Sequence, residues 1–191
     1  AAGTYNEQID IPVITGASAT NTITFDGGSG NASTRIITYT ANAGSPYTVR
    51  LNGCSYVTFK NITIRGTSST DAYVFHFVNG TNNRVARCVI EITGAGATAT
   101  SSNLCPVVLS GSTGAMSTTS ATANNLIVDS CTINAGYYGI YISGGSGSNT
   151  HFFRYNTISN PYYYGFYLNS AITAKILNNS LSMRTNNSSS T

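Results

Sequence analysis

Acidic residues, the usual general acids and bases of polysaccharide-cleaving enzymes, are scarce in this sequence. Only six of the 191 residues are Asp or Glu. Cleavage of a sugar polymer needs clustered carboxylates, together with Arg or Lys or with bound calcium. Asp26, Asp71 and Asp129 instead fall in different frames of the repeating pattern that runs along the chain. We therefore expect no catalytic residues and predict that this chain is not an enzyme.

Sulfur and imidazole groups show no metal-binding spacing. The chain has four cysteines without a Cys-x-x-Cys pair, and its two histidines, His76 and His151, lie far from one another. No Gly-x-Ser-x-Gly sequence marks a nucleophilic serine. We expect neither a metal nor a cofactor.

Two apolar motifs recur along the chain, and the elements that they form must position the acidic, cysteine and histidine side chains. The first motif begins its apolar alternation at Ile23, Val49, Phe75, Val107, Ile140 and Phe166, in steps of 26, 26, 32, 33 and 26 residues. A second motif follows, as in Val57–Ile64, with its last apolar residue at Ile64, Ile90, Ile133, Ile158 and Leu181. Both motifs alternate with period two, which indicates half-buried strands. Two strands per repeat of about 26 residues, separated by Gly, Asn and Ser turns, are typical of one turn of a solenoid.

The sequence therefore predicts an all-β, right-handed parallel β-helix of about six coils. Equivalent residues would stack into inward ladders about 4.8 Å apart. The three ladders are Val49, Phe75, Val107, Ile140 and Phe166; Leu51, Phe77, Leu109, Ile142 and Leu168; and Phe59, Val85, Val128, Phe153 and Ile176. A β-sandwich would not keep one motif in frame this often, and a propeller blade needs about 40 residues.

Stacking places two cysteines beside one another. Cys88 and Cys131 hold the same slot in successive coils, and Asn156 and Asn179 hold it in the next two. Vertical neighbours are close enough for a disulfide, so the pair forms either a bridge or two buried free thiols. The asparagines are expected to hydrogen-bond along the stack in a structural role. Asp129 would face Arg154 as a surface ion pair of small value.

An outward ladder is the candidate ligand-binding surface. It contains Arg50, His76, Val108, Tyr141 and Tyr167, with more tyrosines around it. Exposed tyrosines bind sugar rings through their faces and hydroxyls, but they also stack on one another. The candidate ligand-binding residues are Arg50, His76, Tyr141 and Tyr167. Two insertions, at residues 93–103 and 111–123, lie on either side of the Pro106–Leu109 strand, either as binding loops or as tolerated low-complexity segments.

Composition bears on location and partners. Charged residues make up 8% of the chain and the formal net charge is +3. The nine basic residues form no patch, so we expect no nucleic-acid partner. No apolar run is long enough to span a membrane, so we expect no membrane insertion. The low charge and the abundance of Ser, Thr, Asn and Gly indicate an exported protein, extracellular or at the cell surface, present here as a mature chain or an excerpt.

Two segments also resemble known proteins. Gly3-Thr-Tyr-Asn-Glu-Gln-Ile-Asp-Ile-Pro12 is similar to the opening turn of pectin-lyase-like β-helices. Residues Thr15–Phe25, followed by Tyr47–Ile64, resemble repeats of secreted or surface proteins of Bacteroidetes. The resemblance is strongest over residues 3–66 and continues as generic coils to about residue 183. It implies a long secreted or surface-attached protein in which the β-helix is a stalk or adhesin region.

Together these observations predict a non-enzymatic extracellular module with a structural or adhesive role. Residues 1–183 would form one β-helix domain, and residues 184–191 a polar tail or linker. The open strand edges of a β-helix favour end-to-end stacking of copies. The alternative is a module that binds or cleaves carbohydrate, with glycans as partners.

Overall fold

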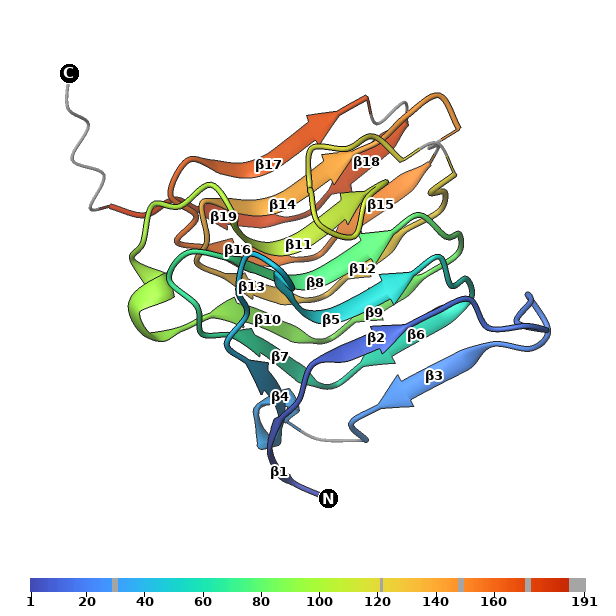
Figure 1. Cartoon of the computed structure of the whole chain (residues 1–191), viewed down its shortest axis with the longest axis horizontal. Helices are drawn as coiled ribbons and strands as arrows, with labels where there is room; N and C mark the ends of the chain where they lie inside the picture. The colour runs from blue at the N-terminus through green and yellow to red at the C-terminus, as the bar shows by residue number, and fades with distance from the viewer. Residues whose placement is uncertain (29–30, 121, 148–149, 171–172, 186–191) are drawn as a thin grey trace.

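The chain forms a right-handed parallel β-helix with three sheets (Figure 1). The computed structural model describes residues 1–28, 31–120, 122–147, 150–170 and 173–185. Each coil passes through sheet A, sheet B and sheet C in turn, and the next coil pairs with it in parallel. This confirms the predicted fold, and the right-handed sense is the one that parallel crossovers adopt.

The strands of each sheet come from successive coils. Sheet A contains β1 (Gly3–Asn6), β4 (Arg35–Tyr39), β7 (Thr63–Gly66), β10 (Val89–Ile92), β13 (Thr132–Asn134), β16 (Thr157–Ser159) and β19 (Ser180–Ser182). Sheet B contains β2 (Ile9–Ile11), β5 (Tyr47–Asn52), β8 (Ala72–Val78), β11 (Leu104–Ser110), β14 (Tyr138–Ser143) and β17 (Tyr164–Asn169). Sheet C contains β3 (Ile23–Asp26), β6 (Val57–Lys60), β9 (Arg84–Ala86), β12 (Ile127–Asp129), β15 (His151–Arg154) and β18 (Ala174–Leu177).

Each coil has three strands, whereas the sequence pattern predicted two. The second motif bends between β6 and β7, where Asn61 has a φ of 58°. Equivalent corner residues with positive φ are Arg87, Ser130, Tyr155 and Asn178. A single left-handed residue turns the chain here, and most of these residue types are uncommon in that conformation. The corner therefore carries no consistent turn signal.

The first copy of the first motif, which begins at Ile23, lies in sheet C and not in the sheet that contains Val49, so this part of the prediction is wrong. Ile23 pairs with Val57 in sheet C, and the partner of Val49 in sheet B is Ile9. Strands of sheets B and C share the same alternation, so periodicity alone does not distinguish them.

The inward ladders form the core as predicted. Val49, Phe75 and Val107 are in register in sheet B, and Phe59, Val85 and Val128 in sheet C. The largest rings in the core, those of Phe59, Phe75, Phe77 and Phe153, are almost completely buried. Burial of a large apolar side chain stabilises a fold by about 1.5–3 kcal/mol. The core is therefore a continuous column between the three sheets.

The corner asparagines bind the backbone along the stack, which confirms their structural role. Asn156 accepts a hydrogen bond from the backbone N–H of Cys131 at 2.9 Å and donates one to the carbonyl of Val128 at 3.0 Å. Asn179 accepts from the backbone N–H of Asn156 at 2.9 Å. These bonds satisfy buried backbone groups at a bend where the regular sheet pairing is interrupted.

The two insertions lie at different corners. The first contains a 3₁₀ turn, η2 (Gly94–Ala97), between β10 and β11, and another, η1 (Ala32–Thr34), precedes β4. The second insertion leaves β11 and lies against the outer side of sheet B (Figure 1). In the described ranges no helix is both long and apolar enough to cross a membrane.

After the last strand, β19, Arg184 is hydrogen-bonded to an earlier coil of the β-helix. Arg184 donates hydrogen bonds to the carbonyls of Ala97 at 2.7 Å and Thr98 at 2.9 Å. The predicted tail begins at this residue, and positions 186–191 lie outside the described residues. The domain boundary therefore stays a prediction.

Candidate functional site

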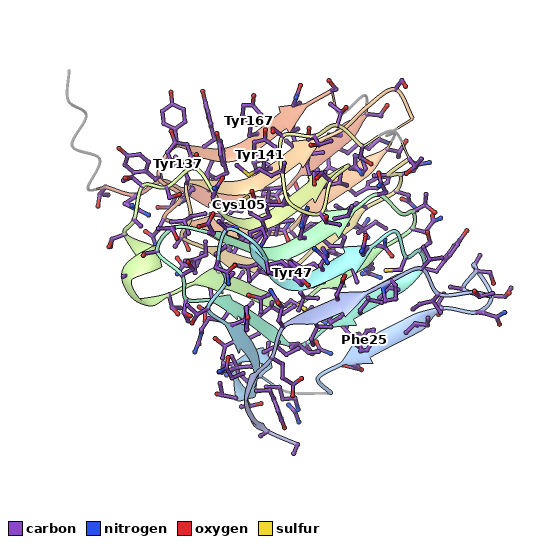
Figure 2. All side chains as sticks on the ribbon, viewed as in Figure 1. Phe25, Tyr47, Cys105, Tyr137, Tyr141 and Tyr167 are labelled. Carbon is purple, nitrogen blue, oxygen red and sulfur yellow. The ribbon has the colours of Figure 1, made fainter. Side chains whose placement is uncertain are left out.

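Two columns of side chains run up the outer face of sheet B. The second column is the predicted ladder: Arg50, His76, Val108, Tyr141 and Tyr167. The first column, which the sequence analysis did not identify, contains Tyr47, Tyr73 and Cys105 in register, and Tyr138 and Tyr164 in register in the last two strands. Figure 2 shows Tyr47, Cys105, Tyr141 and Tyr167 at successive heights of the stack. Tyr47 and Tyr73 stand two residues before Val49 and Phe75. This constant spacing in the repeat would have been enough to predict the first column from the sequence.

The second insertion buries much of the predicted ladder. Met116, at the centre of this loop, packs in a cluster with Cys105, Val108 and Tyr141. His76 has no exposed surface, and Tyr141 is only 6% exposed. The expectation of an open row of exposed tyrosines is therefore corrected at Tyr141, because the loop covers the middle of the sheet.

His76 holds the covering loop to the sheet. Its Nε2 lies 2.8 Å from Ser110 Oγ, and that hydroxyl donates to the carbonyl of Ser112 at 2.9 Å. Because the hydroxyl hydrogen of Ser110 is donated to Ser112, His76 Nε2 must carry a hydrogen and donate it to Ser110 Oγ. Burial lowers the pKa of His76 to about 3, so the ring is neutral at ordinary pH. Its role here is positional, and it is not accessible as a base.

Arg50 is also engaged. Its guanidinium forms an ion pair with Asp10 at 2.6 Å and lies 4.0 Å from the ring centre of Tyr47. It also donates to the carbonyl of Thr113 in the loop at 3.4 Å. Hydrogen bonding to Arg50 is the main reason that the pKa of Asp10 is lowered. Arg50 and His76 therefore fasten the loop to sheet B and do not reach a ligand.

A hollow of about 370 Å³ opens beside Met116, between the two insertions. Its walls include three rings from sheet B, those of Tyr73, Tyr138 and Tyr141. Polar side chains from the two insertions complete it: Ser102, Asn103 and Ser117. Hollows that combine aromatic faces with a few polar groups are typical of small-ligand sites.

The tyrosines that line the hollow keep their hydroxyl hydrogens. Burial, followed by the neighbouring tyrosines Tyr137, Tyr141 and Tyr167, raises the pKa of Tyr138 to about 12. Burial also raises the pKa of Tyr73 and of Tyr141. Each hydroxyl is therefore able to donate and to accept a hydrogen bond across the neutral range.

Further tyrosines extend this surface toward the last coil. Tyr141 and Tyr167 stack with ring centres 4.8 Å apart and an interplanar angle of 18°. Tyr138 and Tyr164 lie 6.1 Å apart at 10°. Tyr163 remains 54% exposed. The tyrosines thus stack on one another, as one of the two sequence-based alternatives expected, and also leave aromatic surface open to solvent.

Four carboxylates of the coils are held in ion pairs, those of Asp10, Asp26, Glu91 and Asp129. Asp129 lies 3.3 Å from Arg154, as predicted, and 2.6 Å from Arg84, whose diagonal position the sequence analysis did not consider. Asp26 accepts from Asn61 and from the backbone of Gly28, and with Lys60 these bonds lower its pKa to about 2. The pKa of Asp129 is lowered as well: burial opposes ionisation, but Ser130 and the two arginines outweigh it. These groups are ionised, whereas a general acid needs a raised pKa.

All four cysteines are free thiols buried in the structure. Cys88 and Cys131 are neighbours in successive coils, as predicted, and of the two alternatives for them the structure has the thiols. Burial raises the pKa of Cys54 and Cys88 to about 11. Among the described residues, no three His, Cys, Asp or Glu side chains come close enough to hold a metal ion.

Comparisons with known proteins give one family and one solved structure. Residues 6–191 match the family described as periplasmic copper-binding protein (NosD). None of the curated proteins matches the chain. A pectin methylesterase from Aspergillus niger, in deglycosylated form, is similar with 17% sequence identity and a TM-score of 0.36, covering 94% of this chain and 74% of that one.

Proposed function

The chain belongs to the NosD family, and from that premise we propose that it is a non-catalytic β-helix module that binds a glycan on the outer face of sheet B. The observation that carries the proposal is the hollow framed by Tyr73, Tyr138 and Tyr141 and by polar side chains of both insertions. A rigid sheet supplies the aromatic faces, and the loops supply groups that hydrogen-bond sugar hydroxyls. The two insertions thereby act as binding loops.

The charged groups support a binding role without catalysis. Ion pairs or hydrogen bonds to cationic and polar neighbours lower the pKa of Asp10, Asp26 and Asp129. Of the residues that line the hollow, none is acidic. Sugar recognition needs neither an acid nor a base, whereas cleavage needs both.

We also propose that the module lies outside the cytoplasm, in the cell envelope or at the cell surface. The description of the matched family names a periplasmic protein. The composition agrees with this, because charged residues are 8% of the chain and Ser, Thr, Asn and Gly replace them. An exported location would also give the site access to glycans of the envelope or of the surroundings.

Copper, which the family description names, does not fit the donors of this chain. Copper sites use thiolate, thioether and imidazole ligands. His76 and Cys105 are completely buried, and burial raises the pKa of the Cys105 thiol. Nδ1 of His151 accepts the backbone N–H of Leu126 at 3.3 Å. Within the described ranges no three His, Cys, Asp or Glu side chains come together, so the proposal includes no metal.

A glycan array followed by calorimetry with the best glycan tests the proposal. Tyr138→Ala is expected to weaken binding by about tenfold or more, because an aromatic anchor of a site contributes roughly 1–2 kcal/mol. Tyr155→Ala is the matched control, since this tyrosine is 58% exposed at a corner away from the hollow. Failure of the intact protein to bind any glycan, or equal losses in the two variants, would refute the proposal.

A second candidate role, which we also propose, is end-to-end assembly into a structural or adhesive fibre. At the last coil two apolar side chains are open: Ile176, the last member of an inward ladder, is 45% exposed, and Leu181, which pairs with Ile158 in sheet A, is 48% exposed. The strands at both ends of the stack pair on one side only. Unpaired strand edges with apolar side chains favour stacking on another copy.

A further inference from the structure

A second hollow, of about 250 Å³, lies where the segment after β19 meets the first insertion. Figure 1 shows η2 and this segment on the same side of the molecule. The polar side chains in the wall of the second hollow include those of Thr98, Asn134, Asn160 and Arg184. Ser102 and Asn103 of the first insertion line the hollow beside Met116, which is the first hollow. The first insertion therefore borders both hollows.

The guanidinium of Arg184 gives the second hollow a positive charge. It donates hydrogen bonds to the carbonyls of Ala97 at 2.7 Å, Thr98 at 2.9 Å and Ala99 at 3.5 Å. A guanidinium has more N–H donors than these bonds use. Within the described part of the chain, Arg184 forms no ion pair, and no acidic residue lines the hollow. The second hollow therefore contains a cation without a carboxylate partner.

The polar groups beside Arg184 favour an anionic ligand. Asn134 Oδ1 accepts hydrogen bonds from Asn160 at 2.9 Å and from Ser159 at 3.0 Å. This oxygen is thus used within the protein, whereas the NH₂ group of Asn134 is a donor. Hydrogen bonds from a guanidinium to a carboxylate or sulfate oxygen are shorter and stronger than those between neutral groups. The wall of the second hollow thus suits an acidic group better than a neutral one.

Tyrosine rings connect the two hollows around the corner between sheets B and A. Tyr138 lines the first hollow, and its ring centre is 4.9 Å from that of Tyr137. The ring of Tyr137 is in turn 5.5 Å from that of Tyr162. The guanidinium carbon of Arg184 lies 5.4 Å from the ring centre of Tyr162. Tyr137 and Tyr162 are both only half-buried, so aromatic surface leads from the first hollow to the second.

We infer that the glycan is an acidic oligosaccharide or polysaccharide that extends across both hollows and binds a carboxylate or sulfate group of one sugar at Arg184. The inference rests on the proposed glycan binding and narrows its ligand class. The apolar faces of the sugars lie on the connecting tyrosines. Asp71, which accepts a hydrogen bond from Asn103 at 3.0 Å, places a carboxylate at the edge of the first hollow. Repulsion by Asp71 and attraction by Arg184 direct the acidic sugar to the second hollow.

The decisive experiment compares acidic oligosaccharides with neutral forms of the same length by calorimetry. One pair is a hyaluronan hexasaccharide and its carboxyl-reduced form, and the other is a sulfated galactan hexasaccharide and its desulfated form. In at least one pair the acidic form is expected to bind about tenfold more tightly than the neutral form. The pair that shows this preference identifies the acidic group as carboxylate or sulfate.

Two variants assign the preference to Arg184. Arg184→Gln removes the charge and should abolish the preference, while affinity for the neutral form changes by less than about threefold. Lys175→Gln is the matched control, because it removes an exposed cation from β18 in the same last coil, and it should keep the preference.

The outcomes separate this inference from the proposal beneath it. Failure to bind any glycan, on the array or in calorimetry, refutes glycan binding itself. Equal affinity for acidic and neutral forms in both pairs, or an undiminished preference in a folded Arg184→Gln, leaves glycan binding intact and overturns the acidic site. If Arg184→Gln does not fold, Thr98→Glu replaces it, because an exposed carboxylate in the second hollow would pair with Arg184. An unchanged preference in that variant likewise overturns the acidic site.

Discussion

At the scale of single residues, buried polar side chains complete the backbone hydrogen bonding of the coils. Asn83 accepts the backbone N–H of Val57 at 3.1 Å. His151 accepts the N–H of Leu126 at 3.3 Å from the same slot two coils later. An unsatisfied buried N–H costs about 1–3 kcal/mol, so both side chains are structural. His151 thus has the structural role that Asn83 has two coils earlier. Nothing in the sequence around His151 distinguished this role from a catalytic or metal-binding one.

The buried histidines make the fold sensitive to acid. Burial lowers the pKa of His76 to about 3 and that of His151 to about 4, whereas an unfolded histidine titrates near 6.5. The unfolded chain therefore takes up protons first as the pH falls, and stability is lost progressively below pH 6.5. Between pH 7 and pH 5 each histidine is expected to cost about 2 kcal/mol of unfolding free energy. Denaturant unfolding at the two pH values measures this change.

The control for acid sensitivity removes the two titrations. His151→Asn keeps an acceptor for Leu126, and His76→Gln keeps a donor for Ser110. The double variant should lose much less stability between pH 7 and pH 5 than the intact chain. An equal loss in both proteins would show that other groups cause the acid sensitivity.

At the scale of elements, the second insertion converts part of a sheet face into a covered site. Gly111 donates to the carbonyl of Thr118 at 2.8 Å and closes the loop at its base. Ser143 on β14 donates to the carbonyl of Ser117 at 3.0 Å. Met116 supplies the apolar contact between these two anchors. The sequence marked both insertions but did not decide between binding loops and tolerated low-complexity segments, because their small polar residues carry no periodicity.

Removal of the apolar anchor should loosen the loop without unfolding the coils. Met116→Ala deletes a buried side chain, which costs about 2 kcal/mol or more. The amide of Gly111 is then expected to exchange its hydrogen roughly 30-fold faster, while the amides of β8 and β11 change little. Hydrogen exchange measures both. Thr119→Ala, at an exposed position of the same loop, is the control and should leave the exchange of Gly111 unchanged.

At the scale of the whole molecule, stability and assembly follow from stacking. Each coil contacts mainly its neighbours, so the central coils are buried on both sides and the end coils on one. Phe75 and Val107 in the middle have no exposed surface, whereas Ile176, Leu177 and Leu181 in the last coil are exposed. These apolar ends are the surfaces that the proposed end-to-end assembly would use.

If copies assemble end to end, the size of the particles should increase with protein concentration. Charged residues placed on the last coil should prevent this association. Replacement of Ile176 and Leu181 by Lys places two cations on the open edge and is expected to abolish association. Thr157→Lys adds a cation to the exposed side of sheet A and should leave association unchanged. Analytical ultracentrifugation and electron microscopy report the outcome. An intact chain that stays monomeric at every concentration, or equal association in all variants, contradicts the fibre role.

The periodic apolar residues were sufficient to predict the β-helix, its ladders and the slot shared by Cys88 and Cys131. Stacking repeats one coil, so the sequence interval translates directly into spatial neighbours such as Val49 and Phe75. The third strand of each coil stayed hidden, because one left-handed residue such as Arg87 forms the corner without a consistent turn signature. Only the tertiary structure decided which outward residues a ligand could reach. Long-range contacts of an aperiodic loop cover His76 and Tyr141 and leave a hollow open beside Met116, and no local pattern encodes where such a loop comes to lie.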